Sequence, residues 1–293
     1  MDNGSPGKDI TKLDLVEKFP LVASQYIGHR STFEVCGVPF GGKLIPVMAG
    51  PNTVESLEQI SDIASAVKKS GAHFLRGGAF KPLSFPYRSS KYFELREQGL
   101  EYLQVVRKKF GIPIITEVME ESKIEAVAAV ADIVQIGSRN MQNYPLITKV
   151  AELGLPLMIK RHYGASLRDW LGAAEYALVT GNNRVILCER GVVAPHTHRS
   201  TSRFMLDLQV IPAAQEVTHL PVVSDPSHAT FWAPWVTPMA LSSIAAGADG
   251  LMIEVHPNPA EAAVDPLQPL DFSEFQSLML KARKVAASVG RMI

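Results

Sequence analysis

Eight short, largely apolar runs recur along the chain, and longer amphipathic segments separate them. Each run spans four to six residues, and most are followed by Gly, Pro, Asn or a charged residue. Runs of this kind are typical of parallel strands that are covered on both faces. The predicted strands are Leu44–Ala49, His73–Arg76, Ile112–Glu117, Asp132–Ile136, Pro156–Lys160, Val185–Glu189, Pro221–Ser224 and Gly250–Glu254.

The segments between these runs have apolar residues at three- and four-residue spacing, which predicts helices, and several end at Gly after basic residues. Eight strand-then-helix units in about 250 residues predict a single (β/α)8 TIM barrel, an α/β fold. An open doubly wound sheet is the alternative, but no GxGxxG motif follows any predicted strand. We expect a polar N-terminal arm with a short helix over residues 1–31 and a barrel domain over 32–293, which begins with a β-hairpin.

Composition excludes several classes of protein. The 29 basic and 29 acidic side chains balance, whereas nucleic-acid and anionic-membrane binders need a basic surplus. Two cysteines, Cys36 and Cys188, cannot staple a secreted scaffold or form a four-ligand zinc site. The chain has no apolar stretch of about 18 residues, and its start is too polar for a secretory signal. We therefore expect a cytoplasmic protein with small-molecule partners.

Polar residues gather where the predicted strands end, which is the face on which TIM barrels carry their chemistry. Five of them are cationic: Arg76, Lys81, Arg139, Lys160 and Arg190. Gathered in one barrel mouth they would repel each other unless they bound a multiply charged anion. A small phosphorylated carboxylate fits this pattern. The alternative is that each cation forms an ion pair at the barrel rim.

A second cluster consists of His228, Glu254 and Asp265, with Asn52 across the mouth. Imidazole and carboxylate groups are ligands for divalent transition metals, whereas an amide is a poor one. The alternative is that His228 is a structural histidine with its hydrogen bonds satisfied.

Several motifs resemble one family. The segments MAGPNTVES, LRGGAFKP, ITEVM, VQIGSRNMQN, MIKR, VILCERG, LPVVSDPSHAT and AAGADGLMIEVHPNP are similar to the 3-deoxy-D-arabino-heptulosonate 7-phosphate (DAHP) synthases. The resemblance is to the short subgroup, which is also similar to the 3-deoxy-D-manno-octulosonate 8-phosphate (KDO8P) synthases, and it extends from about Thr32 to the C-terminus. It implies a transferase in which C3 of phosphoenolpyruvate attacks an aldose phosphate, water adds at C2 and phosphate leaves. It also implies a homodimer or homotetramer.

The resemblance assigns roles to individual residues. The five cations Arg76, Lys81, Arg139, Lys160 and Arg190 would hold phosphoenolpyruvate. Lys81 would also protonate the nascent alkoxide, and Glu117 would position the water or accept its proton. In metal-dependent members a Cys, a His, a Glu and an Asp bind a divalent ion. The corresponding residues here are Asn52, His228, Glu254 and Asp265.

Asn52 is the first departure, because loss of a thiolate removes a soft ligand and a negative charge. Metal-independent KDO8P synthases carry Asn at this place. We therefore predict catalysis with no cofactor, in which Asn52 hydrogen-bonds the aldehyde or its new hydroxyl and His228 also belongs to the catalytic set. The alternative is a weak site for Mn²⁺, Zn²⁺ or Fe²⁺ formed by His228, Glu254 and Asp265.

The second departure concerns the other substrate. Related heptulosonate synthases continue Arg-Thr-Ser-Pro-Tyr after the Lys-Pro, whereas this chain continues Leu83-Ser84-Phe85-Pro86-Tyr87. The segment after the sixth strand is longer and adds His196, His198 and Arg199, while Arg203 keeps the family's Arg. We expect Ser84, Arg203 and Asp265 to contact the second substrate.

These changes favour a specialised enzyme that accepts another aldehyde, including an unphosphorylated one, as in secondary metabolism. The alternatives are an ordinary DAHP synthase of the shikimate pathway, in which Arg88, Arg199 or the histidines recover the phosphate contact, and a KDO8P synthase-like enzyme. A non-catalytic scaffold is disfavoured, because a scaffold has no use for a pocket of cations.

Overall fold

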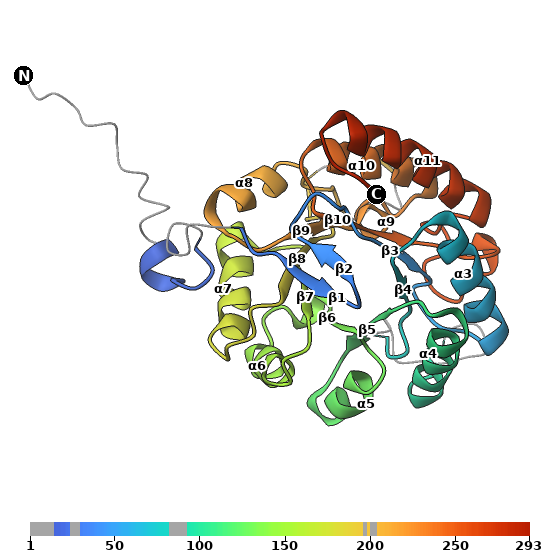
Figure 1. Cartoon of the computed structure of the whole chain (residues 1–293), viewed down its shortest axis with the longest axis horizontal. Helices are drawn as coiled ribbons and strands as arrows, with labels where there is room; N and C mark the ends of the chain where they lie inside the picture. Colours follow the sequence, from blue (N-terminus) through green and yellow to red (C-terminus); the bar gives the residue numbers. More distant parts are fainter. Residues whose placement is uncertain (1–14, 24–29, 82–92, 196–197, 200–203) are drawn as a thin grey trace, which may run out of the picture.

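Eight parallel strands close into a barrel in the computed structural model, which describes residues 15–23, 30–81, 93–195, 198–199 and 204–293 (Figure 1). Around the barrel the strands follow in the order β10-β3-β4-β5-β6-β7-β8-β9. Their bounds are β3 (Val47–Gly50), β4 (Phe74–Arg76), β5 (Ile114–Val118), β6 (Ile133–Ile136), β7 (Leu157–Lys160), β8 (Val185–Glu189), β9 (Val222–Ser224) and β10 (Gly250–Glu254). The (β/α)8 prediction is thus confirmed, and all eight predicted strands are present.

Helices surround the barrel (Figure 1). They are α3 (Leu57–Ser70), α4 (Glu97–Phe110), α5 (Ile124–Ala128), α6 (Tyr144–Glu152), α7 (Leu167–Leu178), α8 (Val210–Val217), α9 (Pro226–Thr230), α10 (Ala233–Ala245) and α11 (Phe272–Ser288), with 3-10 turns at Glu121–Lys123, Ser138–Asn140 and Pro259–Glu261. Their ends follow capping chemistry: α7 begins with a Ser166–Asp169 capping box, and α3 ends at Gly71 with φ 96°. None of the helices in the described residues is long and apolar enough to span a membrane.

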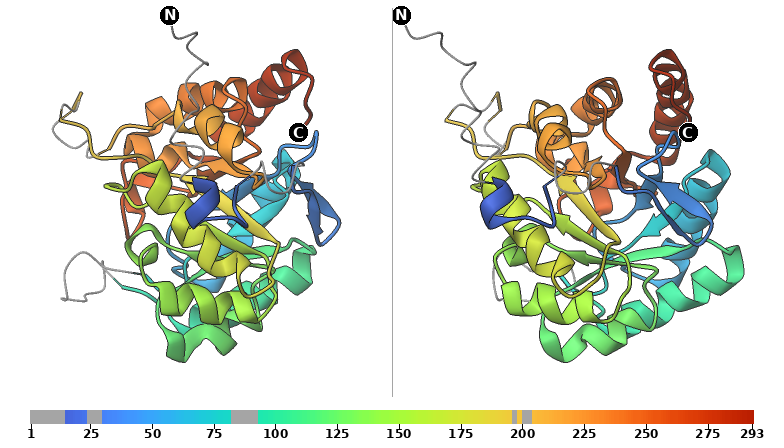
Figure 2. Two further views of the ribbon diagram at one scale, coloured as in Figure 1. Left: turned by 90° about the vertical axis from the view of Figure 1, so that its left-hand side faces the viewer. Right: turned by 60° about the vertical axis from the view of Figure 1, so that its left-hand side comes forward.

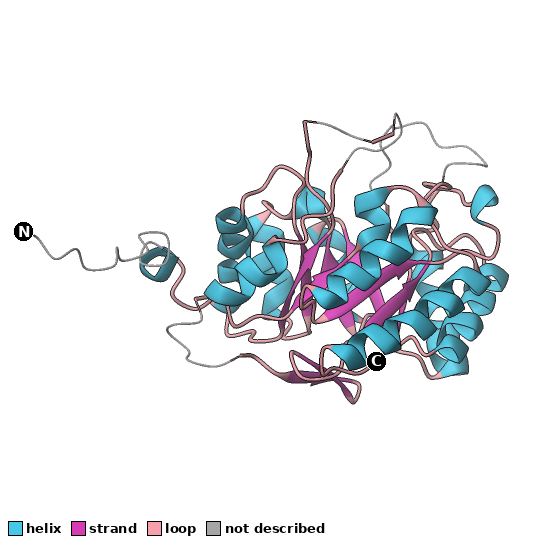
Figure 3. Ribbon diagram, turned by 90° about the horizontal axis from the view of Figure 1, so that it is seen from above, coloured by secondary structure: helices cyan, strands magenta, loops and turns pink. Residues whose placement is uncertain are grey.

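A small hairpin covers the amino end of the barrel. Strands β1 (Phe33–Val35) and β2 (Val38–Phe40) pair through the two-residue turn Cys36-Gly37, whose φ values are both positive. This is the geometry of a type I′ hairpin. Phe40 is fully buried and packs on Phe74 at the floor of the barrel, with 5.6 Å between ring centroids. Figures 2 and 3 show the hairpin on one face of the barrel, and Figure 2 shows the described parts of the β8–α8 connection on the opposite face.

The polypeptide before the hairpin packs on the outside of the barrel. Residues 15–18 form a short helix, and the backbone amides of Leu21 and Val22 donate hydrogen bonds to the Glu175 carboxylate on α7, at 2.9 and 2.8 Å. Ser31 bonds to His219 by backbone and side chain. The described part of the arm is therefore attached to α7 and to the α8–β9 turn.

The alternation of side-chain directions along the strands determines which residues form the site. Successive side chains of a strand point to opposite faces, so every second residue faces the barrel interior. One interior layer is apolar and packs in a single cluster that includes Met48, Phe74, Ile115, Ile133, Met158, Ile186, Val223 and Met252. Two residues further along the strands, the interior positions are Arg76, Glu117, Gln135, Lys160, Cys188, Asp225 and Glu254. A largely polar ring thus lies directly on an apolar floor at the carboxyl end of the barrel.

Candidate active site

Asn52 is the centre of this ring. Its Oδ1 accepts hydrogen bonds from Arg76 Nη2 at 2.7 Å and from Lys81 Nζ at 2.5 Å, and it lies 3.3 Å from His228 Nε2. Its Nδ2 donates to Asp265 Oδ2 at 2.9 Å. The side chain is 3% exposed. One amide therefore joins four residues that the sequence predicts as functional and that lie up to 213 positions away.

Glycines allow the segments that carry these groups to approach each other. Gly50 has φ 148°, and a Cβ at this position would lie 2.1 Å from the carbonyl oxygen of Arg76. A Cβ at Gly78 would lie 2.3 Å from the carbonyl oxygen of Asn52 and 2.9 Å from Lys81 Cδ. The glycines in AGPN and RGGAF thus bring the Arg76–Lys81 segment against Asn52.

Asp225 joins Lys160 to His228. The fully buried carboxylate accepts a hydrogen bond from Lys160 Nζ and lies 2.9 Å from His228 Nδ1. Burial alone would raise the pKa of Asp225, but His228 and Lys160 keep it well below its usual value. Burial lowers the pKa of His228 well below its usual value despite Asp225. A neutral ring that donates from Nδ1 presents its Nε2 lone pair toward Arg76 Nη2, 3.4 Å away.

Two groups in the ring have pKa values displaced toward the same pH. Burial, followed by the nearby charge of Arg76, lowers the pKa of Lys81 to about 8. Burial and the charge of Asp265 raise the pKa of Glu254 to about 8, although Arg76 opposes this shift. Glu254 also accepts a hydrogen bond from the fully buried Gln268. Lys81 is therefore suited to give up a proton near neutral pH.

Glu117 is held on the opposite side of the ring. Its Oε2 accepts from Gln135 Nε2 at 2.9 Å, and the two residues are register partners on β5 and β6. A Cβ at Gly137 would lie 2.0 Å from Glu117 Oε1. The Gly of QIGSRN therefore leaves room for this carboxylate.

The cations differ in how they are paired. Lys160 has a carboxylate partner in Asp225, and Arg76 Nη1 lies 3.8 Å from Glu254. Arg76 Nη1 and Arg190 Nη1 are nevertheless buried without a hydrogen-bond partner among the described residues. Arg190 lies over the ring of Phe204 at 4.4 Å, and burial lowers its pKa. Acids in the ring thus reduce the excess of positive charge that we expected. Two guanidinium groups still have buried N–H groups that are free to donate hydrogen bonds to a ligand.

Arg139 is the one predicted residue among those described that lies apart from this centre. Arg139 is exposed on the 3-10 turn after β6, although its charge still lowers the pKa of Arg190. Ser84 and Arg203 lie outside the described residues. Their predicted contacts with the second substrate therefore stay predictions.

The alternation of side chains along the strands also distinguishes charged residues that face the barrel interior from those that face outward and have a structural role. Arg161 and Glu189 point away from the barrel interior, and Arg161 Nη1 contacts Glu189 at 3.0 Å and Asp207 at 2.9 Å. These residues fasten the β8–α8 connection. Asp225 and Gln135 are interior residues with polar side chains that our sequence-based site assignment omits, although each lies two positions after an apolar interior residue.

The ring does not fit a metal ion in this arrangement. Among the described residues, no three His, Cys, Asp or Glu side chains are grouped to hold one. His228 Nε2 and Glu254 are 3.7 Å apart, but Arg76 lies against both, at 3.4 and 3.8 Å. Asn52 Oδ1 accepts from two cationic groups. A divalent cation among these donors would be repelled, so we derive no step through a metal.

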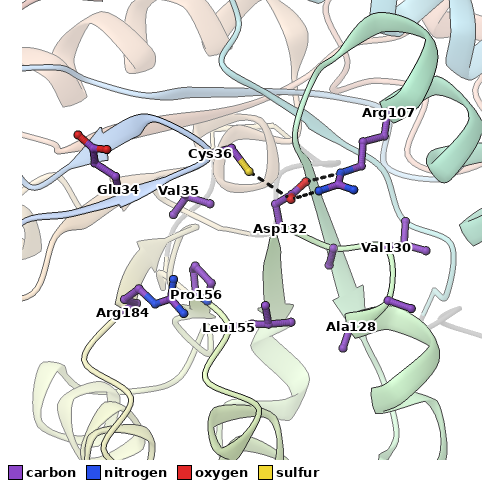
Figure 4. Close-up of a pocket in the computed structure, with 12 residues that line it drawn as sticks. Glu34, Val35, Cys36, Arg107, Ala128, Val130, Asp132, Leu155, Pro156 and Arg184 are labelled. Atoms are coloured by element: carbon purple, nitrogen blue, oxygen red, sulfur yellow. Dashed lines mark hydrogen bonds and ion pairs between the residues drawn. The ribbon is translucent and has the colours of Figure 1, made fainter.

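A cavity of about 330 Å³ lies at the other end of the barrel, beside the hairpin (Figure 4). There Asp132 forms an ion pair with Arg107 and accepts a hydrogen bond from Cys36 Sγ at 3.2 Å. None of the described residues that line this cavity has a buried side-chain nitrogen or oxygen without a hydrogen-bond partner, in contrast to the polar ring.

Comparisons with known proteins agree with this geometry. The family model described as the DAHP synthetase I family matches residues 35–289. A phospho-2-dehydro-3-deoxyheptonate aldolase of Thermotoga maritima is 35% identical over 94% of this chain and 80% of its own length. A 2-dehydro-3-deoxyphosphooctonate aldolase of Methylococcus capsulatus is 28% identical over 80% of this chain and 86% of its own.

Solved structures are similar as well. The crystal structure of the Thermotoga maritima DAHP synthase matches with a TM-score of 0.86 and 36% identity, over 93% of this chain and 78% of that one. A truncated form of the Thermotoga maritima enzyme matches with a TM-score of 0.85 and 34% identity, over 94% of this chain and 99% of that one. The fold, the polar ring and these matches together show that the chain is an enzyme that belongs to the DAHP synthetase I family.

Proposed function

We propose that this enzyme condenses phosphoenolpyruvate with an aldehyde to give a 3-deoxy-2-ulosonate and inorganic phosphate. The observation that carries the proposal is the pair of buried guanidinium donors without hydrogen-bond partners, on Arg76 and Arg190. Buried donors are rarely left unsatisfied, so a ligand with several acceptor oxygens is the expected partner. Phosphoenolpyruvate offers a carboxylate and a phosphate of the right size for such a mouth.

The reaction follows from the groups in the ring. C3 of phosphoenolpyruvate bonds to the aldehyde carbon, and the aldehyde oxygen becomes an alkoxide that takes a proton from Lys81. Water adds at C2 and gives one proton to Glu117. The bond from C2 to the phosphate oxygen then breaks, the C2 hydroxyl passes its remaining proton to the departing phosphate, and C2 becomes a carbonyl. Arg76, Lys160 and Arg190 stabilise the charge on the departing phosphate. Gln135 orients Glu117 throughout, because it donates to the carboxylate at 2.9 Å.

We also propose that the reaction needs no metal. Asn52 takes the position of a metal-ligating thiolate in the family, and its amide already organises Arg76, Lys81 and Asp265. When the aldehyde binds, the amide N–H of Asn52 would donate its hydrogen bond to the aldehyde oxygen in place of Asp265. This hydrogen bond would polarise the carbonyl without a Lewis acid. Full activity after exhaustive chelation is the expected result. Loss of activity that Mn²⁺ or Zn²⁺ restores would refute this part of the proposal.

The aldehyde is proposed to differ from erythrose 4-phosphate. Support comes from the sequence, where Leu83 and Ser84 replace the Arg-Thr pair of related heptulosonate synthases. An ordinary DAHP synthase is the second candidate, because the matched relatives with the higher identities carry that name. The test is phosphate release from phosphoenolpyruvate with a panel of aldoses. Micromolar affinity for erythrose 4-phosphate with rapid turnover would support the second candidate instead.

A homodimer or homotetramer is proposed from the resemblance to the family. Light scattering coupled to size-exclusion chromatography measures the mass directly, and a monomer of 31.9 kDa would refute it.

A further inference from the structure

Arg199 is a stacked cation on the connection between β8 and α8. Its guanidinium carbon lies 3.6 Å from the centroid of the Trp232 ring, and its Nε is buried with no hydrogen-bond partner in the part of the chain that the structure describes. A cation–π contact uses the face of the guanidinium and leaves its in-plane donors available. Arg190, at the start of the same connection, has the same arrangement over Phe204.

Neither of the two connections that carry this pair supplies a carboxylate. Residues 190–206 contain three Arg and two His but no Asp or Glu. Residues 226–248, which include Trp232, contain no Asp or Glu either. Glu189, Asp207 and Asp225, which flank these segments, already pair with Arg161 or Lys160. The cations of the β8–α8 connection therefore favour an anionic ligand.

The pair also lies close to the polar ring. Trp232 follows α9, the short helix that carries His228, and it precedes α10. The β8–α8 connection packs on α9, because a Cβ at Gly191 would lie 2.9 Å from Ala229 Cα. The segment that carries Arg199 and the helix that carries His228 are therefore neighbours at the carboxyl end of the barrel.

We propose that Arg199, supported by Trp232, binds a distal anionic group of the aldehyde substrate, either a phosphate or a carboxylate. This inference rests on the proposed function, and it names the class of the second substrate. Arg199 would thereby replace the guanidinium that Leu83 removes from the family's motif. It is a specificity-determining residue for the aldehyde and not for phosphoenolpyruvate.

The experiment compares the wild-type enzyme with Arg199→Gln, Arg199→Lys and Trp232→Leu. The matched control is Arg168→Gln, because Arg168 lies over the Phe19 ring at 5.4 Å on the outside of α7. Phosphate release is followed with erythrose 4-phosphate, arabinose 5-phosphate, the two free sugars, and succinic semialdehyde as the carboxylate aldehyde. Direct binding of each compound is measured by calorimetry.

The Arg199→Gln change should raise KM for the preferred anionic aldehyde about 10- to 100-fold, the loss expected for one charge-assisted contact. KM for phosphoenolpyruvate and for the free sugars should stay within about twofold, which is below the effect of a single lost hydrogen bond. Arg199→Lys should recover part of the loss, and Trp232→Leu should produce an intermediate rise. Preference among the anionic compounds distinguishes phosphate from carboxylate.

Equal losses for charged and uncharged aldehydes would show that Arg199 only holds the loop, and would overturn the inference. So would wild-type kinetics and binding in Arg199→Gln. If no aldehyde supports phosphate release by the wild-type enzyme, the proposed function fails. The calorimetric binding of the anionic compounds, lost in Arg199→Gln, would still support the subsite in that case.

Discussion

Replacing Asp225 by Asn tests whether the buried carboxylate organises the site. The change is nearly isosteric, but it leaves Lys160 buried without its counter-charge and gives His228 Nδ1 a different partner. Breaking a buried ion pair from one side costs about 3–5 kcal/mol of unfolding free energy. Because Lys160 and His228 lose their fixed orientation, kcat/KM for phosphoenolpyruvate should fall by about 100-fold, as when one preorganised group is removed.

Asp249→Asn is the matched control. Asp249 is also buried, pairs with the two cations Arg30 and Arg291, and accepts a backbone hydrogen bond from Val222, but it lies just before β10 at the amino end of the barrel. Its arginine partners are partly exposed, so the expected cost is smaller, about 1–3 kcal/mol. Its kinetic constants should be unchanged.

The assay combines urea denaturation with steady-state phosphate release at a temperature where both variants are fully folded. The pH dependence of stability gives a second readout. Because the folded-state pKa of Asp225 is depressed, its carboxylate stabilises the fold above the unfolded value of about 4, and the stabilisation is lost as pH falls through the folded pKa. Asp225→Asn should lose this acid-side slope. Wild-type turnover in Asp225→Asn, or an equal kinetic loss in Asp249→Asn, would refute the reasoning.

Three further predictions concern other parts of the molecule. The kcat/KM for phosphoenolpyruvate should decline above about pH 8, because Lys81 must be protonated to act as an acid and its pKa is about 8; a flat pH profile to pH 10 would contradict this. Gly137→Ala should lower kcat at least about tenfold, since a Cβ would lie 2.0 Å from Glu117 Oε1, whereas Gly42→Ala, which has open space, should have no effect. Cys36→Asn should raise the unfolding free energy, measured in urea, by about 0.5–1 kcal/mol, because residue 36 has a φ of 51° and Asn tolerates positive φ better than Cys. A lower unfolding free energy would show that the lost Cys36–Asp132 contact outweighs the relief of backbone strain.

The barrel could be predicted because its strands are short, apolar and buried on both faces, which leaves little ambiguity in a regular alternation with helices. The predicted strand boundaries differ from the observed ones where other hydrogen bonds compete with the backbone hydrogen bonds of the barrel. Leu44 was predicted in the first barrel strand, but it bridges to Met292 near the C-terminus, and β3 begins at Val47. Asp132 was predicted in the fourth strand, but its side chain accepts hydrogen bonds from Ile114 and Arg107 just before β6.

The sequence predicts which residues form the site, but it does not predict which of their side chains form ion pairs with one another. Residue types at strand ends identify the cations, yet only the fold shows that Lys160 is matched by Asp225 while Arg190 retains a donor without a partner. These pairings join residues from different strands, and the sequence carries no local signal for them. The alternation of side chains along a strand does, however, predict the direction of Asp225. Val223 is apolar and faces the barrel interior, so the side chain two positions later faces the same interior.

Asn52 shows why residue type and three-dimensional context must be considered together. A thiolate at this position would attract a metal ion and could not donate a hydrogen bond to Asp265. The amide accepts from Arg76 and Lys81 and donates to Asp265 at the same time. It thereby holds two cations within hydrogen-bonding distance of one oxygen, which no cationic metal could share without displacing them. Under the proposed function, Asn52 therefore does more than omit a metal ligand: a neutral amide positions both the proposed proton donor Lys81 and the guanidinium of Arg76.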